Sequence, residues 1–333
     1  MSNPISKKVG RRDFLQGSLA AAGAIVGLSI PQSSYAGTRN TDTVRLGWGR
    51  GGLPLITKQR GEFEKSLAAK GIKVEWVGPF PNHAPSLQAV VGGSADFGFW
   101  GSSTPAFAAI IAGSPLVFTQ FSLYEPRTTA IIAKKDSGIN KIEDLVGKSV
   151  AVNRSGLGEF LLVAALEKHG VDRSKVNFVY LNPPDAAPAF GQGKVDAWSM
   201  WSPGVDIARA QYDAHDIFFE GKELEFAIDF GSLLTTRTFA TENSELVRAV
   251  IDGYREEAKW VSNNPTESEA IAQKEGKYAD TIRDTLAGYK RKFSFFEVDD
   301  PEFLKRIQFA ADWLSERKIL PQQIAVKDHV LKV

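Results

Sequence analysis

With 333 residues the chain can form two domains of ordinary size, and 43% hydrophobic and 24% charged residues are typical of a soluble globular protein. The absence of cysteine excludes disulfides, thiolate metal sites, a cysteine nucleophile and a lipid anchor on cysteine, and the four histidines show no i, i+4 pairing. The net charge is +1, of which residues 1–36 carry +3, so the remaining −2 gives no electrostatic reason to expect a nucleic-acid partner.

The first 36 residues are predicted to be an export signal. A twin arginine at residues 11–12, followed by Phe14 and Leu15, precedes a mild apolar run over 17–30. This run is too short for a spanning helix, which needs about 20 residues, and a small–x–small cleavage pattern ends at Ala36. The pattern resembles a twin-arginine signal, although the general secretory route stays open. The sequence therefore predicts a periplasmic protein cleaved near Ala36, rather than a cytosolic protein with a basic N-terminal helix.

The rest of the chain alternates between predicted strands and helices. Period-two alternation or short apolar runs predict strands, and apolar residues at helical spacing between caps predict helices. The predicted strands are 44–48, 72–77, 116–121, 129–134, 149–152, 176–181 and 217–219. The predicted helices are 54–70, 84–91, 105–112, 159–169, 186–192, 203–212, 245–262, 265–275 and 301–317. Crossovers are expected at 124–128 and 230–236, which predicts an α/β protein with two lobes joined by two strands.

One motif occurs twice, about one hundred residues apart. Residues 92–105 and 193–203 each read as a turn, an aspartate, an apolar strand and a helix start with serine and proline. Helix N-termini at the carboxyl ends of strands favour anionic ligands. Asp96 and Asp196 are interpreted as turn caps and not as a catalytic pair. Each lies at the turn that enters its strand, opposite the strand end where ligands bind. No nucleophile–base pair is readable, so no enzymatic activity is expected.

Two hydroxyl- and glycine-rich turns are the candidate ligand sites. Backbone N–H groups and hydroxyls at Ser102–Thr104 and at Ser155–Gly156 suit an oxyanion, although serine and threonine are also common as plain helix caps. Trp201 is expected to border the ligand, and Trp198 is expected to lie in the core. Arg50 is expected either to pair with the anion or to be solvated. The candidate ligand-binding residues are Arg50, Gly51, Ser102, Ser103, Thr104, Asn153, Ser155, Gly156, Trp201 and Ser232. No metal or cofactor is expected.

Several stretches resemble the periplasmic solute-binding proteins of nitrate/sulfonate/taurine-type ABC importers, and most closely the aliphatic sulfonate binders. The similar stretches are Gly61–Lys65, Val74–Trp76, Gly93–Gly98, Asp144–Asn153, Tyr180–Ala186, Val195–Trp198 and Ala325–Asp328. The resemblance covers most of residues 44–333. It implies a two-lobed periplasmic-binding-protein fold of type II that closes about a hinge. Segments 44–124 and 235–333 would form lobe 1, and segment 129–230 would form lobe 2.

The resemblance also implies a function. It points to capture of a small organic anion, an aliphatic sulfonate first, by a monomer that delivers it to an inner-membrane permease and its ATPase. The turn Gly101–Pro105 and the sequence Trp201-Ser202-Pro203 depart from the sulfonate pattern, so the ligand does not follow from the resemblance. Nitrate, taurine, an aromatic acid or a pyrimidine precursor are the alternatives, followed by an enzyme on the same scaffold.

Overall fold

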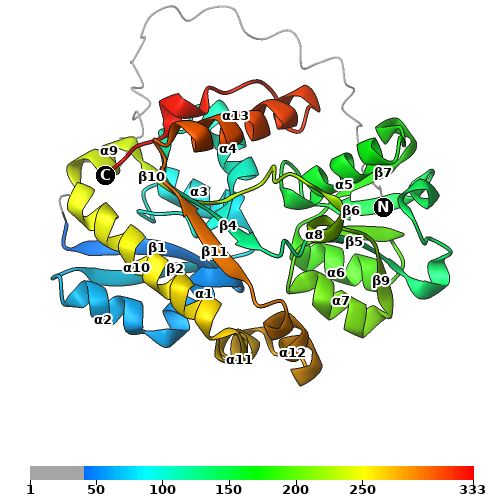
Figure 1. Ribbon diagram of the computed structural model, residues 1–333, viewed down its shortest axis with the longest axis horizontal. Helices are drawn as coiled ribbons and strands as arrows, with labels where there is room; N and C mark the ends of the chain where they lie inside the picture. Colours follow the sequence, from blue (N-terminus) through cyan, green and yellow to red (C-terminus); the bar gives the residue numbers. More distant parts are fainter. Residues whose placement is uncertain (1–40) are drawn as a thin grey trace, which may run out of the picture. The chain divides into compact units, whose positions relative to one another are not determined.

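The computed structural model describes residues 41–333 (Figure 1). The predicted export signal and its cleavage near Ala36 lie outside the described residues. Among residues 41–333, no helix combines the length and the apolar character that a bilayer span requires. The α/β class predicted from the sequence is confirmed, with strands in three sheets and helices packed around them.

Residues 43–125 and 231–333, called the first region here, contain two sheets. A parallel pair, β1 with β2, lies beside a four-stranded antiparallel sheet in the order β11-β4-β10-β3 (Figure 1). The strands are β1 (Thr43–Gly49), β2 (Lys73–Phe80), β3 (Gly101–Ser102), β4 (Leu116–Glu125), β10 (Gly231–Thr236) and β11 (Lys292–Phe296). The helices are α1 (Gly52–Arg60), α2 (Glu62–Ala68), α3 (His83–Val91), α4 (Ser103–Ile111), α9 (Arg237–Glu242), α10 (Ser244–Asn263), α11 (Pro265–Gly276), α12 (Asp280–Gly288) and α13 (Pro301–Glu316), with a final 3₁₀ turn η4 (Val326–His329).

Residues 130–219, called the second region, contain a five-stranded sheet in the order β7-β6-β8-β5-β9. Strands β6, β7 and β8 are parallel, and β5 is antiparallel to both of its neighbours. The strands are β5 (Ala130–Lys134), β6 (Ser149–Val152), β7 (Asn177–Tyr180), β8 (Ala197–Met200) and β9 (Ala214–Phe219). The helices are α5 (Leu157–Lys168), α6 (Pro183–Gly191) and α7 (Gly204–Tyr212), with 3₁₀ turns η1 (Lys135–Ser137), η2 (Ile142–Leu145) and η3 (Arg173–Lys175).

Two segments, 126–129 and 220–230, connect the regions, and the second carries the short helix α8 (Glu220–Glu223). Hydrogen bonds hold the segments together: the Glu220 N–H donates to the carbonyl of Thr129 over 2.9 Å, and the Arg127 guanidinium donates to the carbonyls of Leu224 and Phe226. The stretch expected as the return crossover, 230–236, mostly forms strand β10. This strand belongs to the four-stranded sheet, where it pairs antiparallel with β4.

Three predicted elements differ from the structure. The single helix expected over 54–70 is divided at Gly61, whose φ of 70° ends α1 and begins α2. No strand is predicted after residue 244, yet β11 pairs with β4 between α12 and α13. The apolar strand expected after Asp96 is reduced to one bridge, Leu46 with Phe97, and the two-residue β3.

The repeated aspartates share one structural role. Asp96 Oδ2 accepts from the backbone N–H of Arg45 on β1 over 2.7 Å, and its Oδ1 lies 2.6 Å from the Arg45 guanidinium. Asp196 accepts from both the N–H and the hydroxyl of Ser149 on β6, each over 2.7 Å. Each carboxylate therefore joins its turn to the start of a neighbouring strand, which corrects the simple turn-cap interpretation. It also leaves both carboxylates committed to the fold.

Candidate functional site

The first candidate turn begins α4 and is occupied by a carboxylate of the chain itself. Asp229, which precedes β10, places Oδ1 2.6 Å from the Ser102 hydroxyl and 2.9 Å from the Thr104 hydroxyl. The same oxygen accepts from the Thr104 N–H over 3.2 Å and from the Ser103 hydroxyl over 3.4 Å. The Ser103 N–H donates to the carbonyl of Phe230. The donors that were expected to meet a ligand anion are thus largely used by the fold.

The electrostatics of Asp229 matter for any ligand at this turn. Burial raises the pKa of this carboxyl, although the hydrogen bonds from Ser102, Thr104 and Ser103 act in the opposite direction. Asp229 is half-buried, and its Oδ2 makes no hydrogen bond within residues 41–333. The α4 turn therefore offers a ligand the Asp229 carboxyl as a hydrogen-bond acceptor, and not a set of free hydrogen-bond donors.

The turn is supported from below by a buried histidine. His83 is 3% exposed, and its Nδ1 donates to the carbonyl of Ser102 over 2.7 Å. A Cβ added at Gly101 would lie 2.4 Å from the His83 ring, so this position has room only for glycine. Ser232 is fully buried, and its hydroxyl donates to the carbonyl of Gly101 over 3.0 Å. Ser232, a predicted ligand residue, therefore uses its hydroxyl to fix the backbone of the turn.

The second candidate turn begins α5 and leaves two of its donors free. In residues 41–333, no hydrogen bond is made by the backbone N–H groups of Gly156 and Leu157, and the cap residue Gly156 has no side chain that could accept one. Asn153 Oδ1 accepts from the Gly158 N–H over 2.9 Å, and its Nδ2 fills the space where a side chain at Gly156 would lie. This helix has twelve residues, and its aligned peptide dipoles place a partial positive charge at its N-terminus.

A buried carboxylate braces this second turn from behind. Glu159 is 3% exposed, and its Oε2 accepts from the Ser155 N–H over 2.7 Å. Its Oε1 accepts from Arg173 and from the Tyr180 hydroxyl, each over 2.8 Å. Ser155 itself has a φ of 47°, uncommon for a residue with a side chain. The turn is thereby held with the N–H groups of Gly156 and Leu157 unpaired.

Two close approaches join the first region to the segments that follow β7 and β8. A Cβ added at Gly51 would lie 3.7 Å from Cδ of Pro203, and Asn82 donates to Asn182 over 2.9 Å. Pro203 follows β8 and Asn182 follows β7, so these contacts lie at the carboxyl ends of the second-region strands. Arg50, expected as an anion partner, instead forms an exposed ion pair with Glu275 on α11 at 2.5 Å.

Trp198 and Trp201 were assigned different roles from the sequence, and their environments differ in the structure. Trp198 is 3% exposed and belongs to the core of the second region, as predicted. Trp201 is half-buried and packs against the same core, next to Ser202, whose buried hydroxyl has no partner among the described residues. The backbone of Gly158, in the first turn of α5, packs against the carbonyl of Ser199 on β8, two positions before Trp201 in the chain.

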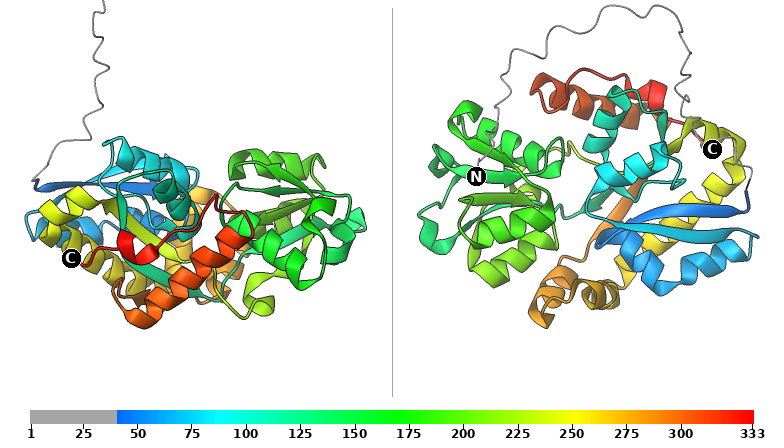
Figure 2. Two further views of the ribbon diagram at one scale, coloured as in Figure 1. Left: turned by 90° about the horizontal axis from the view of Figure 1, so that it is seen from above. Right: turned by 180° about the vertical axis from the view of Figure 1, so that it is seen from behind.

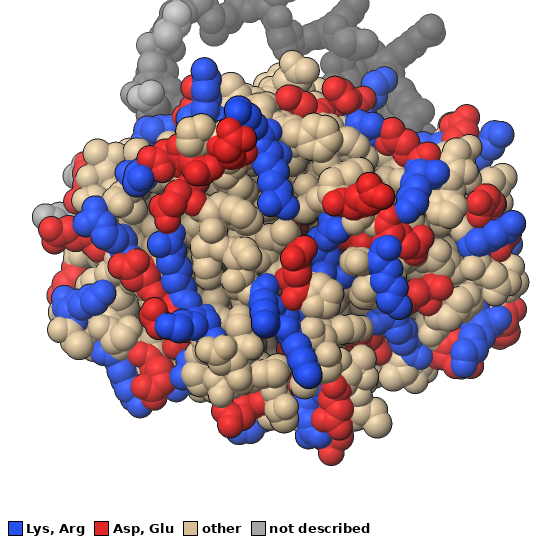
Figure 3. Space-filling view, viewed as in Figure 1, with Lys and Arg blue, Asp and Glu red and all other residues tan. Residues whose placement is uncertain are grey.

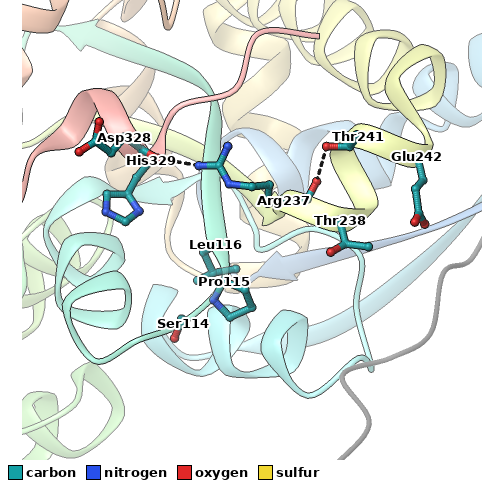
Figure 4. A pocket seen from close by; sticks show the side chains of 9 residues that line it. All are labelled: Ser114, Pro115, Leu116, Arg237, Thr238, Thr241, Glu242, Asp328 and His329. Carbon is teal, nitrogen blue, oxygen red and sulfur yellow. Dashed lines mark hydrogen bonds between the residues drawn. The ribbon is translucent and has the colours of Figure 1, made fainter.

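A separate pocket of about 660 Å³ lies at the start of β4, beside α9 and η4 (Figure 4). None of the predicted ligand residues lines it. Arg237 crosses it to donate to the carbonyl of Asp328 over 2.6 Å, and Glu242 and His329 also line it. Elsewhere, residues 41–333 hold no group of three or more histidine, aspartate or glutamate side chains with the geometry of a metal site. Lysine, arginine and acidic side chains are intermixed over the face shown in Figure 3.

Sequence reasoning missed Asp229 and Glu159, the two carboxylates that define the turns. Glu159 had a readable signal, because an acidic residue three positions after the helix cap is the spacing of a capping box. Asp229 had none, since its partners lie more than one hundred residues away in the chain.

The comparisons with known proteins concern the family and the fold. The NMT1/THI5-like family model matches residues 58–268, more than half of the chain. The chain belongs to the NMT1/THI5-like family. This family member is 27% identical over 314 residues, 94% of the chain and 95% of the relative, to an Escherichia coli K12 protein named for binding aliphatic sulfonates. It is also 33% identical to the Escherichia coli K12 taurine-binding periplasmic protein, over 136 residues and 41% of each chain.

Among solved structures, this NMT1/THI5-like chain is similar to the alkanesulfonate-binding protein SsuA from Xanthomonas axonopodis pv. citri bound to MOPS. The TM-score is 0.79 at 22% identity, covering 89% of this chain and all of that one. This likeness shows that the two proteins share a fold, which confirms the expected periplasmic-binding-protein architecture. The curated relatives named above are binding proteins by name.

Proposed function

We propose that this protein is the periplasmic substrate-binding component of an ABC importer and that it captures a small organic sulfonate. In this proposal, segments 44–124 and 235–333 form one lobe and segment 129–230 the other, with the ligand held between them. A membrane permease and its ATPase would receive the ligand. Support comes from family membership, from the relatives named for sulfonate and taurine binding, and from the segregation of strands into two regions.

The contrast between the two helix N-termini carries the proposal. The open α5 turn offers unpaired N–H groups at Gly156 and Leu157, which suit a sulfonate. The α4 turn offers Asp229 Oδ2, which makes no hydrogen bond within residues 41–333 and, when ionised, repels an anion and attracts a donor. We therefore propose that the sulfonate lies at the α5 turn and that a donor group at the other end of the ligand, an ammonium above all, faces Asp229. Trp201 would cover the apolar part.

Of the other predicted ligand residues, Asn153 and Ser155 are proposed to shape the α5 turn, and Gly51 to let the backbone approach. Ser102, Ser103 and Thr104 are proposed to orient Asp229 rather than to bind the anion directly, because their hydroxyls already donate to it. Arg50 and Ser232 are engaged with Glu275 and Gly101 and are proposed to support the site only indirectly.

A binding panel tests the proposal. Purified protein is titrated by calorimetry with taurine, ethanesulfonate, sulfate, nitrate, benzoate and a pyrimidine, and melting temperature is followed in parallel. We expect taurine to bind more tightly than ethanesulfonate, which lacks the amine, and both to bind more tightly than sulfate or nitrate. Binding of a pyrimidine or benzoate without any sulfonate would overturn the ligand class. Turnover of a bound compound would replace the transport role by an enzymatic one.

A further inference from the structure

A chain of polar contacts joins the end of α13, in the first region, to the side of α5, in the second. Arg317 follows α13 directly and grips both carboxylate oxygens of Glu167: Nε lies 2.5 Å from Oε2 and Nη2 lies 2.6 Å from Oε1. This ion pair lowers the pKa of the Glu167 carboxyl, chiefly through the hydrogen bond from Arg317. Two parallel charge-assisted hydrogen bonds fix direction as well as distance.

In the segment that follows α13, two backbone carbonyls accept hydrogen bonds from the second region. The carbonyl of Arg317 accepts from Arg173 Nη1 over 3.0 Å, and the carbonyl of Ile319 accepts from the Ser155 hydroxyl over 3.1 Å. Beneath these polar contacts, Trp313 of α13 packs edge-on against Phe160 of α5, with ring centroids 5.6 Å apart. Figure 2 shows α13 extending from the first region towards the helices of the second.

These contacts continue into the open α5 turn. Arg173 holds the Arg317 carbonyl through Nη1 and the buried Glu159 carboxylate through Nη2. Glu159 in turn accepts from the Ser155 N–H, and the Ser155 hydroxyl returns to the Ile319 carbonyl. The network is a closed ring that passes through both regions. Movement of α13 away from α5 must therefore break or displace the contacts that hold Ser155 in its unusual conformation.

We propose that Arg317 and Arg173 are positioning residues that couple the separation of the two regions to the geometry of the α5 turn. In this role, the α13–α5 contact is a non-covalent and breakable link between the regions, in addition to the two connecting segments and to the hydrogen bonds of Asn82 with Asn182 and of Tyr289 with Asp206. With the contact made, the N–H groups of Gly156 and Leu157 are held ready for an anion. The part that concerns ligand affinity rests on the proposed function, whereas the coupling between the regions does not.

The coupling is tested first without any ligand. Because the chain has no cysteine, Lys70→Cys and Lys194→Cys, at exposed positions in the first and second regions, allow specific spin labelling. Distances between the labels are measured by pulsed electron resonance in this background and with Arg317→Ala, Glu167→Gln or the reversed pair Arg317→Glu/Glu167→Arg. We expect a longer or broader distribution for both single variants and a return towards the background in the reversed pair.

The matched control is Lys305→Ala on α13, since Lys305 pairs only with Glu302 of the same helix. Unfolding curves of each variant establish that it is folded before distances are compared, and Arg317→Lys serves as a milder variant that keeps the charge but loses the two-pronged geometry. An unchanged distribution in folded Arg317→Ala and Glu167→Gln protein would overturn the coupling.

The positioning role is tested with taurine and ethanesulfonate as probes. We expect Arg317→Ala and Arg173→Lys to weaken binding of both probes by about three- to tenfold, and Lys305→Ala to leave it unchanged. Added salt should weaken binding less in Arg317→Ala than in the unmodified protein, because an exposed ion pair is screened. Unchanged affinity in a variant whose distances have changed would overturn the positioning role. If the unmodified protein binds neither probe, the proposed function fails while the distance measurements still decide the coupling.

Discussion

Asp229 Oδ1 lies 2.9 Å from the hydroxyl oxygen of Thr104, at the N-terminus of α4, and this contact sets the polarity of the candidate site. A helix N-terminus with three hydroxyl side chains ordinarily suits an anion from outside. Here the anion belongs to the chain. At the corresponding end of α5 the N–H groups of Gly156 and Leu157 make no hydrogen bond within residues 41–333, so the two turns differ in the donors they leave free although the sequence presents them alike.

Removing the charge of Asp229 should reverse the order of the sulfonates. Asp229→Asn keeps the shape and an accepting oxygen for Ser102 and Thr104 but loses the negative charge. We expect taurine to bind roughly ten- to a hundredfold more weakly, as for the loss of about 1.5–3 kcal/mol from a hydrogen bond to a charged group. Ethanesulfonate should bind as well as before or better. Calorimetric titration of both compounds measures the change.

A matched control for this variant is Asp42→Asn. Asp42 is exposed and also accepts from a hydroxyl, that of Thr43, over 3.0 Å. It precedes β1 and lies away from both turns in the sequence, so taurine affinity should not change. Equal weakening by both substitutions, or weaker ethanesulfonate binding in Asp229→Asn, would contradict the assigned role.

Substitution of Gly158 should destabilise the α5 turn. A Cβ at this position would lie 2.5 Å from the carbonyl oxygen of Ser199 and 2.8 Å from Asn153 Oδ1. Because the nearest atom is backbone in a central strand, it cannot move aside cheaply, and Gly158→Ala should lower the free energy of unfolding by about 2 kcal/mol or more. Urea denaturation followed by circular dichroism measures the change.

Gly288, near the end of α12, is the matched control. A Cβ there would meet nothing within 4 Å. Gly288→Ala should therefore be neutral or should stabilise by about 0.5–1 kcal/mol through the lower entropy of the unfolded chain. A Gly158→Ala protein as stable as Gly288→Ala would show that the close packing of α5 on β8 is wrong.

Glu220 should make stability fall as the pH rises. Burial raises the pKa of this carboxyl to about 7, although Arg127, 3.5 Å away, opposes the shift. Between the unfolded pKa near 4.5 and the folded pKa near 7, the native state binds a proton that the unfolded chain has lost. The stabilisation by the neutral Glu220 carboxyl is therefore complete below about pH 4.5 and is lost as the pH rises towards and through 7. The loss approaches about 3 kcal/mol by pH 8.

The comparison for Glu220 is with Glu220→Gln, which stays neutral at every pH. Its free energy of unfolding should exceed that of the unmodified protein at pH 8 and approach it at pH 5. The exposed Glu245→Gln should follow the unmodified protein throughout. A parallel pH dependence of Glu220→Gln and the unmodified protein would exclude Glu220 as the source.

His83 should have the opposite pH dependence. Burial lowers the pKa of its imidazole to about 4, against the hydrogen bond to Ser102. The unfolded chain therefore binds a proton below about pH 6.5 that the folded chain does not bind until about pH 4, so stability falls as the pH falls through this window. The loss approaches about 3 kcal/mol. His83→Gln should be less stable at pH 7 but should lose less between pH 6.5 and pH 4.

The His83 prediction is measured as a difference between variant and unmodified protein, because Glu220 acts in the opposite direction over part of the same range. His169→Gln provides the control, since His169 is only half-buried, beside the exposed Glu143. If His83→Gln and the unmodified protein lose equal stability on acidification, then protonation of His83 does not destabilise the fold.

The α/β class, the alternation of strands and helices and the core position of Trp198 follow from the sequence. These features depend on residues near one another in the chain, because alternation, caps and apolar runs act over a single element. The same local patterns located both turns and the repeated aspartates, and the resemblance to solute-binding proteins rests on similarly short stretches.

What each turn offers to a ligand depends on long-range packing. Ser102, Ser103 and Thr104 face Asp229 because β10 runs beside β3, and a sheet order that joins residues more than one hundred positions apart leaves no local trace. The pairing of Arg50 with Glu275 is likewise long-range. Local sequence patterns thus set where hydrogen-bond donors are concentrated, whereas contacts between distant segments set which of these donors remain free.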